Sequence, residues 1–278
     1  MISNKRQKTV KGICLAFLMV WTLFPIYWMF TLSIRSQDDL NSGFSFYPRS
    51  FSLDNFIGLF TEKGFLNAIL NSLFVTCTSL CVSLVFGVMC SYILSRARFK
   101  FGMKGPMLFW VLLIRILPPI SLALPLYIMM TSLGIINTMT PIVLAHILIN
   151  VPFIIWFLLS FFQKLPVEVE ESAMVDGASE WQMFTKIVLP QVLPGLTAVG
   201  ILSFMTSWNE YLYGVIFVQD PQNFTIPLLL STMNSEQELT QWGMVASGGV
   251  ISLIPVLFFV IFAQNFLISG LSSGAVKE

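Results

Sequence analysis

Charge is scarce in this chain. Of its 278 residues only 10% are charged and only one is histidine, whereas 56% are hydrophobic. A soluble globular domain carries roughly 25% charged residues, and the mean hydropathy of +0.81 points the same way. This composition excludes an ordinary soluble protein and favours a chain whose main solvent is lipid.

Residues for catalysis and energy conversion are also missing. The four cysteines, Cys14, Cys77, Cys81 and Cys90, form no CxxC pair and have no neighbouring histidine, so we expect inert, lipid-buried thiols and no metal site. No Ser-His-Asp or paired-carboxylate group is apparent. The sequence has no Gly-Lys dipeptide and therefore lacks the phosphate-binding loop of an ATPase. We predict that the chain is not an enzyme and binds no cofactor itself.

What the chain does have is a set of long apolar runs. A helix needs about 20 mainly apolar residues to cross roughly 30 Å of hydrocarbon. Six segments are long enough, near residues 12–34, 68–94, 106–131, 138–161, 192–218 and 242–268. They predict an all-α polytopic membrane protein with six transmembrane helices, kinked at Pro118-Pro119 and at Pro152. With no repeat and no separate soluble segment, residues 1–278 are expected to form a single transmembrane domain.

The positive charges predict the orientation of these helices, because lysine and arginine gather in cytoplasmic loops. One side of a six-helix arrangement holds Lys5, Arg6, Lys8, Lys11, Arg96, Arg98, Lys100, Lys104, Lys164, Lys186 and Lys277, and the other holds only Arg35, Arg49 and Lys63. We therefore expect both termini and the loop at about 165–190 in the cytoplasm. The segment at 35–67 is then external, and its many aromatic residues suggest that it packs on the outer surface.

The loop contains a polar stretch at residues 170–190, EESAMVDGASEWQMFTKIVLP, between two apolar segments. Pro166 is suited to begin a helix, and Gly177 is suited to end it in the left-handed conformation. Ser179 and Gln182 have the spacing of a capping box, which begins another helix. The stretch is therefore predicted to form two short helices joined by a sharp turn.

The second of these helices, which we expect to end at Pro190, carries an apolar stripe. The stripe recurs at helical spacing and consists of Met174, Ala178, Trp181, Phe184 and Val188. The opposite face is mostly acidic, whereas helices that lie in the headgroup layer are usually rich in lysine and arginine. Docking into a groove of another protein is therefore favoured, with packing on the membrane surface as the alternative.

The same stretch resembles a family motif. The EAA loop of ABC-importer membrane subunits has Glu-Ala-Ala, three residues, Gly, nine residues, and then Ile-x-Leu-Pro. Here Glu171-Ser172-Ala173, Gly177 and Ile187-Val188-Leu189-Pro190 stand at that spacing, with serine in the second position as the one departure. The stretches RILPPISLALPLYIMMTSLGIINT, SWNEYLYGVIF and FLISGLSSGAVKE are similar to the maltose-type second permease of the carbohydrate branch.

The resemblance implies the type I ABC importer fold and a permease that moves a carbohydrate, such as an oligosaccharide, across the bacterial plasma (inner) membrane. It implies a second permease in a heterodimer, a cytoplasmic ATPase dimer that holds ATP and Mg, and an extracytoplasmic sugar-binding protein, but no nucleic acid. The EAA loop would then be the coupling helix, with these residues at the ATPase: Glu170, Glu171, Ser172, Ala173, Asp176, Gly177, Ala178, Trp181, Phe184, Ile187, Leu189 and Pro190.

A secondary carrier driven by an ion gradient is the alternative function. Such carriers often show repeats and several acidic residues inside their spans. Here no repeat is evident, and Glu210 is the only acid inside a predicted span.

Polar residues inside the spans are candidates for the substrate pathway, because ionisable groups are costly in hydrocarbon. Glu210 lies beside Trp208, Asn209 and Tyr211, which offer the flat aromatic faces and hydrogen-bonding groups that sugar sites use. An aromatic belt at the membrane interface would contain the same residue types. Arg115 either belongs to the pathway or anchors the structure by pairing with carbonyls freed by the nearby prolines.

Two further features leave alternatives open. His146 and Asn150, one turn apart in the fourth segment, are expected to form a buried hydrogen-bonded pair, with a proton relay as the alternative. The tail at 269–278 is rich in small residues. It is expected either to enter the ATPase dimer or to be disordered.

Overall fold

The structure is a computed structural model that describes residues 2–96, 104–233 and 241–275. Within these ranges the regular structure is helical, apart from one isolated bridge between Arg35 and Phe51. The prediction of an all-α protein is therefore confirmed. The chain divides into two compact units, residues 1–66 with 229–254 and residues 67–228 with 255–278.

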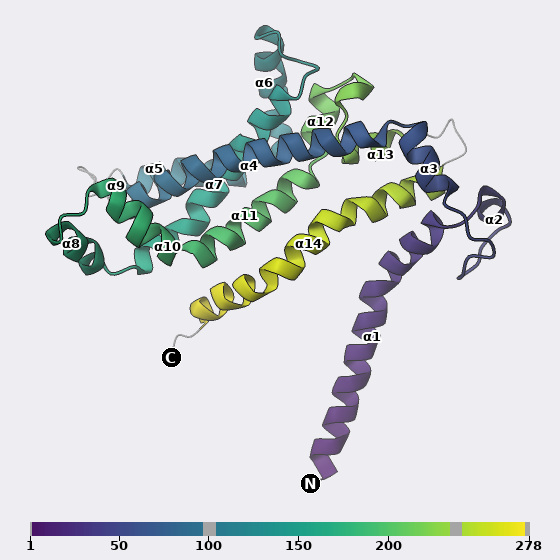
Figure 1. Ribbon diagram of the computed structural model, residues 1–278, viewed down its shortest axis with the longest axis horizontal. Helices are drawn as coiled ribbons and strands as arrows, with labels where there is room; N and C mark the ends of the chain where they lie inside the picture. The colour runs from purple at the N-terminus through teal and green to yellow at the C-terminus, as the bar shows by residue number, and fades with distance from the viewer. Residues whose placement is uncertain (1, 97–103, 234–240, 276–278) are drawn as a thin grey trace. The chain divides into compact units, whose positions relative to one another are not determined.

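The first unit contains α1 (Ile2–Ser33), α2 (Gln37–Asn41), α3 (Asp54–Thr61) and the beginning of α14 (Trp242–Ala275), as Figure 1 shows. The Ser247 hydroxyl on α14 donates a hydrogen bond to the Ser33 carbonyl at 3.3 Å, which ties this helix to the end of α1. α14 continues to Ala275. Residues 269–275 of the expected tail belong to this helix, and residues 276–278 lie outside the described residues.

The segment after α1 folds around Asp39. One carboxylate oxygen of Asp39 accepts the backbone N–H of Arg49 at 2.7 Å and that of Ser50 at 3.3 Å, and it lies 3.9 Å from Nε of Arg35. Arg35, only 2% exposed, also donates to the carbonyl of Ser45. A buried ion pair and main-chain hydrogen bonds thus fold residues 35–50 into a compact hook.

This network makes the first unit sensitive to acid. Burial alone would raise the pKa of Asp39, but the N–H groups of Arg49 and Ser50 and the charges of Arg35 and Arg49 hold that pKa below its ordinary value of 3.8. A carboxyl group whose pKa is lower in the folded chain stabilises it above the unfolded pKa. That contribution is lost as the pH falls through the folded value.

We therefore expect wild-type protein to melt at a higher temperature than Asp39→Asn at pH 6, with the difference shrinking toward zero below about pH 4. Thermal unfolding of the solubilised protein across this pH range measures the effect. Asp38→Asn is the matched control, because Asp38 is exposed and has no ion pair or side-chain hydrogen bond among the described residues. A difference that does not change with pH would contradict the proposed role of the Asp39 carboxylate.

The second unit is built on three long helices, α4 (Phe65–Arg96), α7 (Thr140–Lys164) and α11 (Leu193–Trp208). α7 packs against α11 and against α5 (Lys104–Ile116). Its side chains fill one of the cores, where Ile154, Leu158 and Phe162 are fully buried with Val199 of α11. α7 runs without interruption through Pro152.

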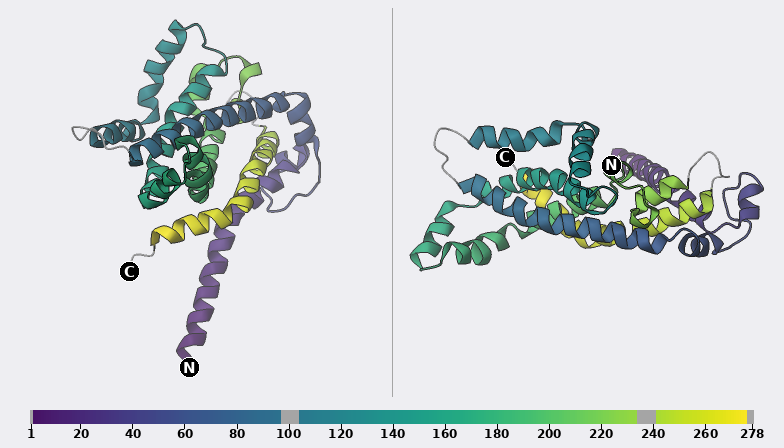
Figure 2. Two further views of the ribbon diagram at one scale, coloured as in Figure 1. Left: turned by 60° about the vertical axis from the view of Figure 1, so that its left-hand side comes forward. Right: turned by 90° about the horizontal axis from the view of Figure 1, so that it is seen from above.

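Two of the six predicted spans are broken. In the third, α5 ends at Ile116 and α6 (Pro119–Ser132) turns away from it by 95°, as the two views in Figure 2 show. The prolines explain the break, because proline lacks a backbone donor and disfavours helical geometry in the residue before it. The structure thus confirms the position of this kink and shows that it is a sharp corner.

The fifth predicted span, at 192–218, is wrong as a continuous helix. α11 ends at Trp208, α12 begins only at Leu212 (Leu212–Phe217), and the chain then continues through η3 (Pro221–Asn223) and α13 (Ile226–Thr232). A further bend of 75° separates residues 180–191 from α11. By length and composition, four helices in the described residues can each cross a membrane, or up to six spans result if each bent pair counts as one.

Three of the cations that predict the orientation, Arg98, Lys100 and Lys277, lie outside the described residues.

Candidate functional site

The loop after α7 begins with α8 (Val167–Val175), which ends at a glycine turn. Gly177 has φ +85°. Its N–H donates to the carbonyl of Met174 at 3.1 Å, and the N–H of Ala178 donates to the carbonyl of Ala173 at 3.0 Å. These two bonds define a Schellman motif, in which glycine takes the left-handed position at low cost. The predicted helix stop at Gly177 is confirmed.

The predicted capping box is also confirmed and begins α9 (Glu180–Met183). The N–H of Ser179 donates to Oε1 of Gln182 at 3.0 Å, and the N–H of Gln182 donates to Oγ of Ser179 at 3.3 Å. The helix then widens into a π-helix, η2 (Phe184–Val188), before α10 (Leu189–Gln191). It therefore passes through Pro190, where we expected it to end.

Of the predicted apolar stripe, only Trp181, Phe184 and Val188 lie on this helix, because Met174 belongs to α8 and Ala178 lies in the turn. The stripe residues are divided between the protein's own core and its surface. Phe184 and Val188 are buried in the core beside α7. Trp181 and Met174 are 66% and 50% exposed. The prediction that Phe184 shares an exposed apolar face with Trp181 is therefore wrong, because Phe184 packs inward.

The other predicted coupling residues also divide by exposure. Glu170 and Ala173 are buried, and Ala178, Ile187 and Leu189 are half-buried. The exposed residues are Glu171, Ser172, Asp176, Gly177, Trp181 and Pro190. The exposed set forms an acidic surface with one large aromatic ring.

Glu170 is held inside the protein by α4. Its Oε1 accepts a hydrogen bond from Nε of Arg96 at 2.7 Å and forms an ion pair with Nη2 of Arg96, also at 2.7 Å. Its Oε2 accepts a hydrogen bond from the Tyr92 hydroxyl at 3.0 Å. Nη2 of Arg96 also donates to the carbonyl of Leu165 at 3.1 Å. Glu170 is therefore an internal anchor of the loop, which corrects its assignment as an ATPase contact. The sequence placed Arg96 and Glu170 on the same side of the membrane, but it did not pair them.

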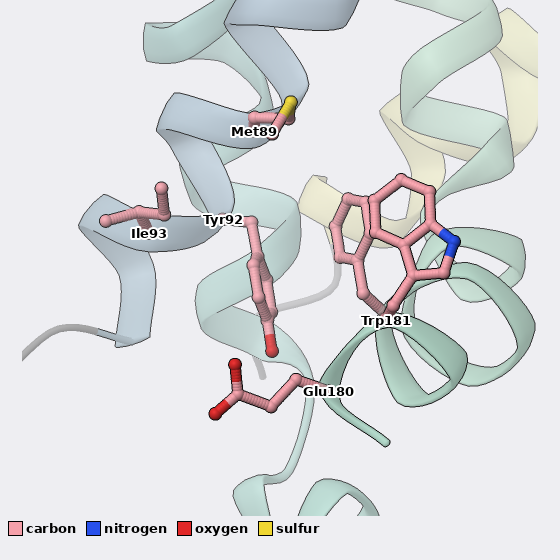
Figure 3. A pocket seen from close by; sticks show the side chains of 6 residues that line it. Met89, Tyr92, Ile93, Glu180 and Trp181 are labelled. Carbon is pink, nitrogen blue, oxygen red and sulfur yellow. The ribbon is translucent and has the colours of Figure 1, made fainter. Parts of the chain in front are cut away.

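A pocket of about 260 Å³ separates the end of α4 from α9. Met89, Tyr92 and Ile93 line it from α4, and Glu180 and Trp181 line it from α9. Figure 3 shows the Trp181 ring across the pocket from Tyr92, with the Glu180 carboxyl group on the side of the Tyr92 hydroxyl. The exposed Trp181 ring thus forms one wall of an aromatic pocket beside the glycine turn.

A second polar cluster lies where α11 breaks. Nε2 of His146 lies 3.3 Å from Oε2 of Glu210, and Nδ2 of Asn150 donates to the Ser207 hydroxyl at 2.8 Å. Oε1 of Glu210 also accepts the N–H of Tyr213 at 3.0 Å, in the first turn of α12. The prediction of a His146–Asn150 pair is therefore wrong. Because the two residues lie one turn apart on α7, each meets a different partner in the chain that passes beside them.

The remaining pathway candidates do not converge on Glu210. Trp208 is buried and stacks on Phe204, Asn209 bonds the carbonyl of Met205 at 2.8 Å, and Tyr211 is 42% exposed. These three residues are close to Glu210 in sequence at the end of α11, but their side chains lie in different environments.

Arg115 has a partner that the sequence did not suggest. Its guanidinium lies 4.6 Å from the ring centroid of Phe153, a cation–π contact between α5 and α7. Nearby, the Tyr213 hydroxyl donates a hydrogen bond to the carbonyl of Pro119 at 3.2 Å.

Three buried polar atoms on α7 and α11 have no hydrogen-bond partner within the described residues. They are Nδ1 of His146, Oδ1 of Asn150 and Oγ of Ser203. The four cysteines are free thiols. Within the described ranges, no group of three or more His, Cys, Asp or Glu residues is placed to hold a metal ion.

Comparison with known proteins identifies the family. The model of the binding-protein-dependent transport system inner membrane component matches residues 83–272, well over half of the chain. The chain therefore belongs to this family of ABC importer permeases. It is a multi-pass inner membrane protein and not itself an ATPase.

Relatives and solved structures agree with this assignment. The chain is 29% identical to the trehalose transport system permease SugB of Mycobacterium tuberculosis over 98% of both chains, and 30% identical to the inner membrane ABC transporter permease YcjP of Escherichia coli over all of both. It is also 30% identical to the diacetylchitobiose uptake permease DasC of Streptomyces coelicolor over 94% of both. A chain of a bacterial ABC transporter that imports alginate has a TM-score of 0.80 at 20% identity, covering 95% of this chain and 97% of that one. This similarity confirms the importer permease fold.

Proposed function

We propose that this permease moves a carbohydrate into the cell, with residues 165–190 as its link to a cytoplasmic ATPase dimer. The chain would act as one transmembrane domain, residues 1–278. It would pair with a second permease and receive sugar from an extracytoplasmic binding protein. ATP and Mg would be held by the ATPase, and both termini of this chain would be cytoplasmic.

The observation that carries the coupling role is the geometry of the glycine turn. A Schellman motif at Gly177 followed directly by a capping box at Ser179 fixes the direction in which α9 leaves α8. Glu171, Asp176 and Trp181 stay exposed around this turn. A rigid projection that keeps its acidic and aromatic side chains free is suited to a cleft on another protein.

The carbohydrate class is supported by the relatives, whose names specify trehalose and diacetylchitobiose. In this chain, the pathway would pass the break in α11. Here Glu210 and Ser207 meet His146 and Asn150 of α7, and Trp208, Asn209 and Tyr211 stand beside Glu210 in sequence as candidates, with Arg115 near the Phe153 ring as a further one. Of the buried atoms without a partner within the described residues, Oδ1 of Asn150 is able to accept a hydrogen bond from a sugar hydroxyl, and Nδ1 of His146 is able to donate or accept one according to its tautomer.

The test is uptake by the assembled complex in proteoliposomes, with ATP inside and a panel of labelled mono- and oligosaccharides outside. We expect accumulation of at least one sugar that requires both ATP and the ATPase. Vesicles that contain the two permeases alone distinguish the alternative. Accumulation driven by an ion gradient in these vesicles would indicate a secondary carrier instead.

A further inference from the structure

The hook in the first unit encloses a pocket of about 320 Å³. Trp28, Phe44 and Trp242 supply aromatic rings to its walls, and Gln37 and Asn41 supply side-chain amides. Its volume lies at the lower end of the roughly 300–1,000 Å³ that small-molecule sites occupy. Flat rings beside free amides are the chemistry that binds sugars, because the rings cover the C–H faces and the amides bond the hydroxyls.

The two amides are positioned to act together. Gln37 and Asn41 are four residues apart on α2 and therefore share one face of that helix. Both side chains are exposed, and neither makes a hydrogen bond within the described residues. Each amide can donate and accept, so the pair matches neighbouring hydroxyl groups on one ring.

The rest of the hook holds this wall in place. A helix of five residues is not stable in isolation, but Ser36 caps α2 by accepting the N–H of Asp39 at 3.3 Å. The Asp39 carboxylate fastens α2 to the following loop. Gly43, at φ +96°, reverses the chain so that the Phe44 ring returns to Trp28, with the ring centroids 5.3 Å apart.

The aromatic wall is partly fixed and partly free. Trp28 is held between Phe44 and the guanidinium of Arg35, which lies 5.4 Å from its ring centroid. Phe44 and Trp242 remain 69% and 54% exposed. The pocket therefore has a preformed back wall and two ring surfaces that a ligand can cover.

We propose that this pocket is a weak saccharide subsite on the external side of the permease, with the sugar ring against Phe44 and Trp242 and its hydroxyls on Gln37 and Asn41. The proposal rests on carbohydrate import and on the external placement of residues 35–67. Its ligand is one ring or a short end of the transported sugar. A lipid or a side chain of the binding protein would be a different occupant.

The test uses the complete transporter in lipid nanodiscs without the binding protein, and saturation-transfer NMR with trehalose and with diacetylchitobiose as probes. Two variants remove the subsite from different helices: the double variant Gln37→Ala/Asn41→Ala on α2, and Trp242→Ala on α14. Asp38→Ala is the control on α2, because Asp38 does not line the pocket. Gel filtration shows whether each complex is assembled.

We expect a sugar signal in the wild type and in Asp38→Ala, and at least about a fivefold weaker signal in both subsite variants. The double variant loses the amide hydrogen bonds to the sugar hydroxyls, and Trp242→Ala loses the apolar ring surface. Equal signals in all four proteins, or no signal in the wild type, would overturn the subsite. A lipid retained by the wild type and lost from both subsite variants, seen by native mass spectrometry, would also overturn it.

ATP-driven uptake in the presence of binding protein separates the subsite proposal from the proposal of carbohydrate import. A wild type that imports sugar without a subsite signal leaves carbohydrate import standing, whereas one that imports no sugar of the panel removes it.

Discussion

Glu170→Gln should lower the stability of the chain and reduce ATP-driven uptake at least about tenfold, whereas Glu171→Gln should leave the stability unchanged. Glu170 is buried and accepts hydrogen bonds from Arg96 and Tyr92. Breaking a fully buried ion pair costs roughly 3–5 kcal/mol. We expect about 2 kcal/mol here, because Arg96 is 16% exposed and keeps its bond to the carbonyl of Leu165. Glu171 is exposed, so its loss should act only at the ATPase.

This pair of neighbouring glutamates separates an internal role from a role in partner binding. Thermal unfolding of the solubilised permease measures the first, and co-purification of the ATPase together with uptake measures the second. Glu170→Gln should shift the melting temperature in the absence of the ATPase. Equal melting temperatures for the two variants would show that the Arg96 contact contributes little, and the loop would then need another anchor.

Gly177→Val should leave the permease in the membrane but reduce uptake about tenfold and weaken its hold on the ATPase. A residue with a side chain in the left-handed conformation costs roughly 1–2 kcal/mol, and each 1.4 kcal/mol is a factor of ten. Branching at Cβ adds to this cost. No atom lies within 4 Å of a Cβ placed on Gly177. The cost in the isolated chain is therefore one of backbone conformation, not of space.

Gly177→Asn is the matched control, since asparagine adopts the left-handed conformation far more readily than valine. If the turn itself is what couples, the asparagine variant should bind the ATPase and transport nearly as well as the wild type. If both variants fail equally, the surface at Gly177 must fit closely against the ATPase, and any side chain would obstruct it. Normal uptake and normal ATPase binding by Gly177→Val would remove the coupling role of this turn.

The sequence correctly predicts those parts of the loop whose conformation depends on residues close together along the chain. The glycine stop and the capping box each depend on residues within five positions of one another, and both are present as predicted. The contacts that join the loop and α11 to the rest of the chain are different. Arg96 and Glu170 are 74 positions apart, and His146 and Glu210 are 64 apart. Helical periodicity places each residue on a face, but it does not show which face of another helix it meets.

The same limit explains the division of the apolar stripe. Phe184 and Trp181 have the residue type and spacing of one face, yet Phe184 packs against the core and Trp181 is exposed. A pattern of apolar residues indicates burial but does not distinguish the protein's own core from a partner.

Mean hydropathy does not reveal where helices end inside the membrane. The predicted span at 192–218 is apolar on average, so the break after Trp208 is hidden in the average. An unwound stretch is tolerated at membrane depth when protein surrounds it. Here, Glu210 and Asn209 supply hydrogen bonds to the backbone at the break.

The wide turn between Phe184 and Val188 lets the helix after the glycine turn hold one extra residue. The N–H of Leu189 reaches back five residues to the carbonyl of Phe184, so this turn contains one residue more than an α-helix would. Each residue of an α-helix rotates the chain by about 100°. Because this turn already accommodates one extra residue, deleting one residue between Phe184 and Val188 should restore an α-helical turn and leave the following Leu189–Gln191 segment in phase.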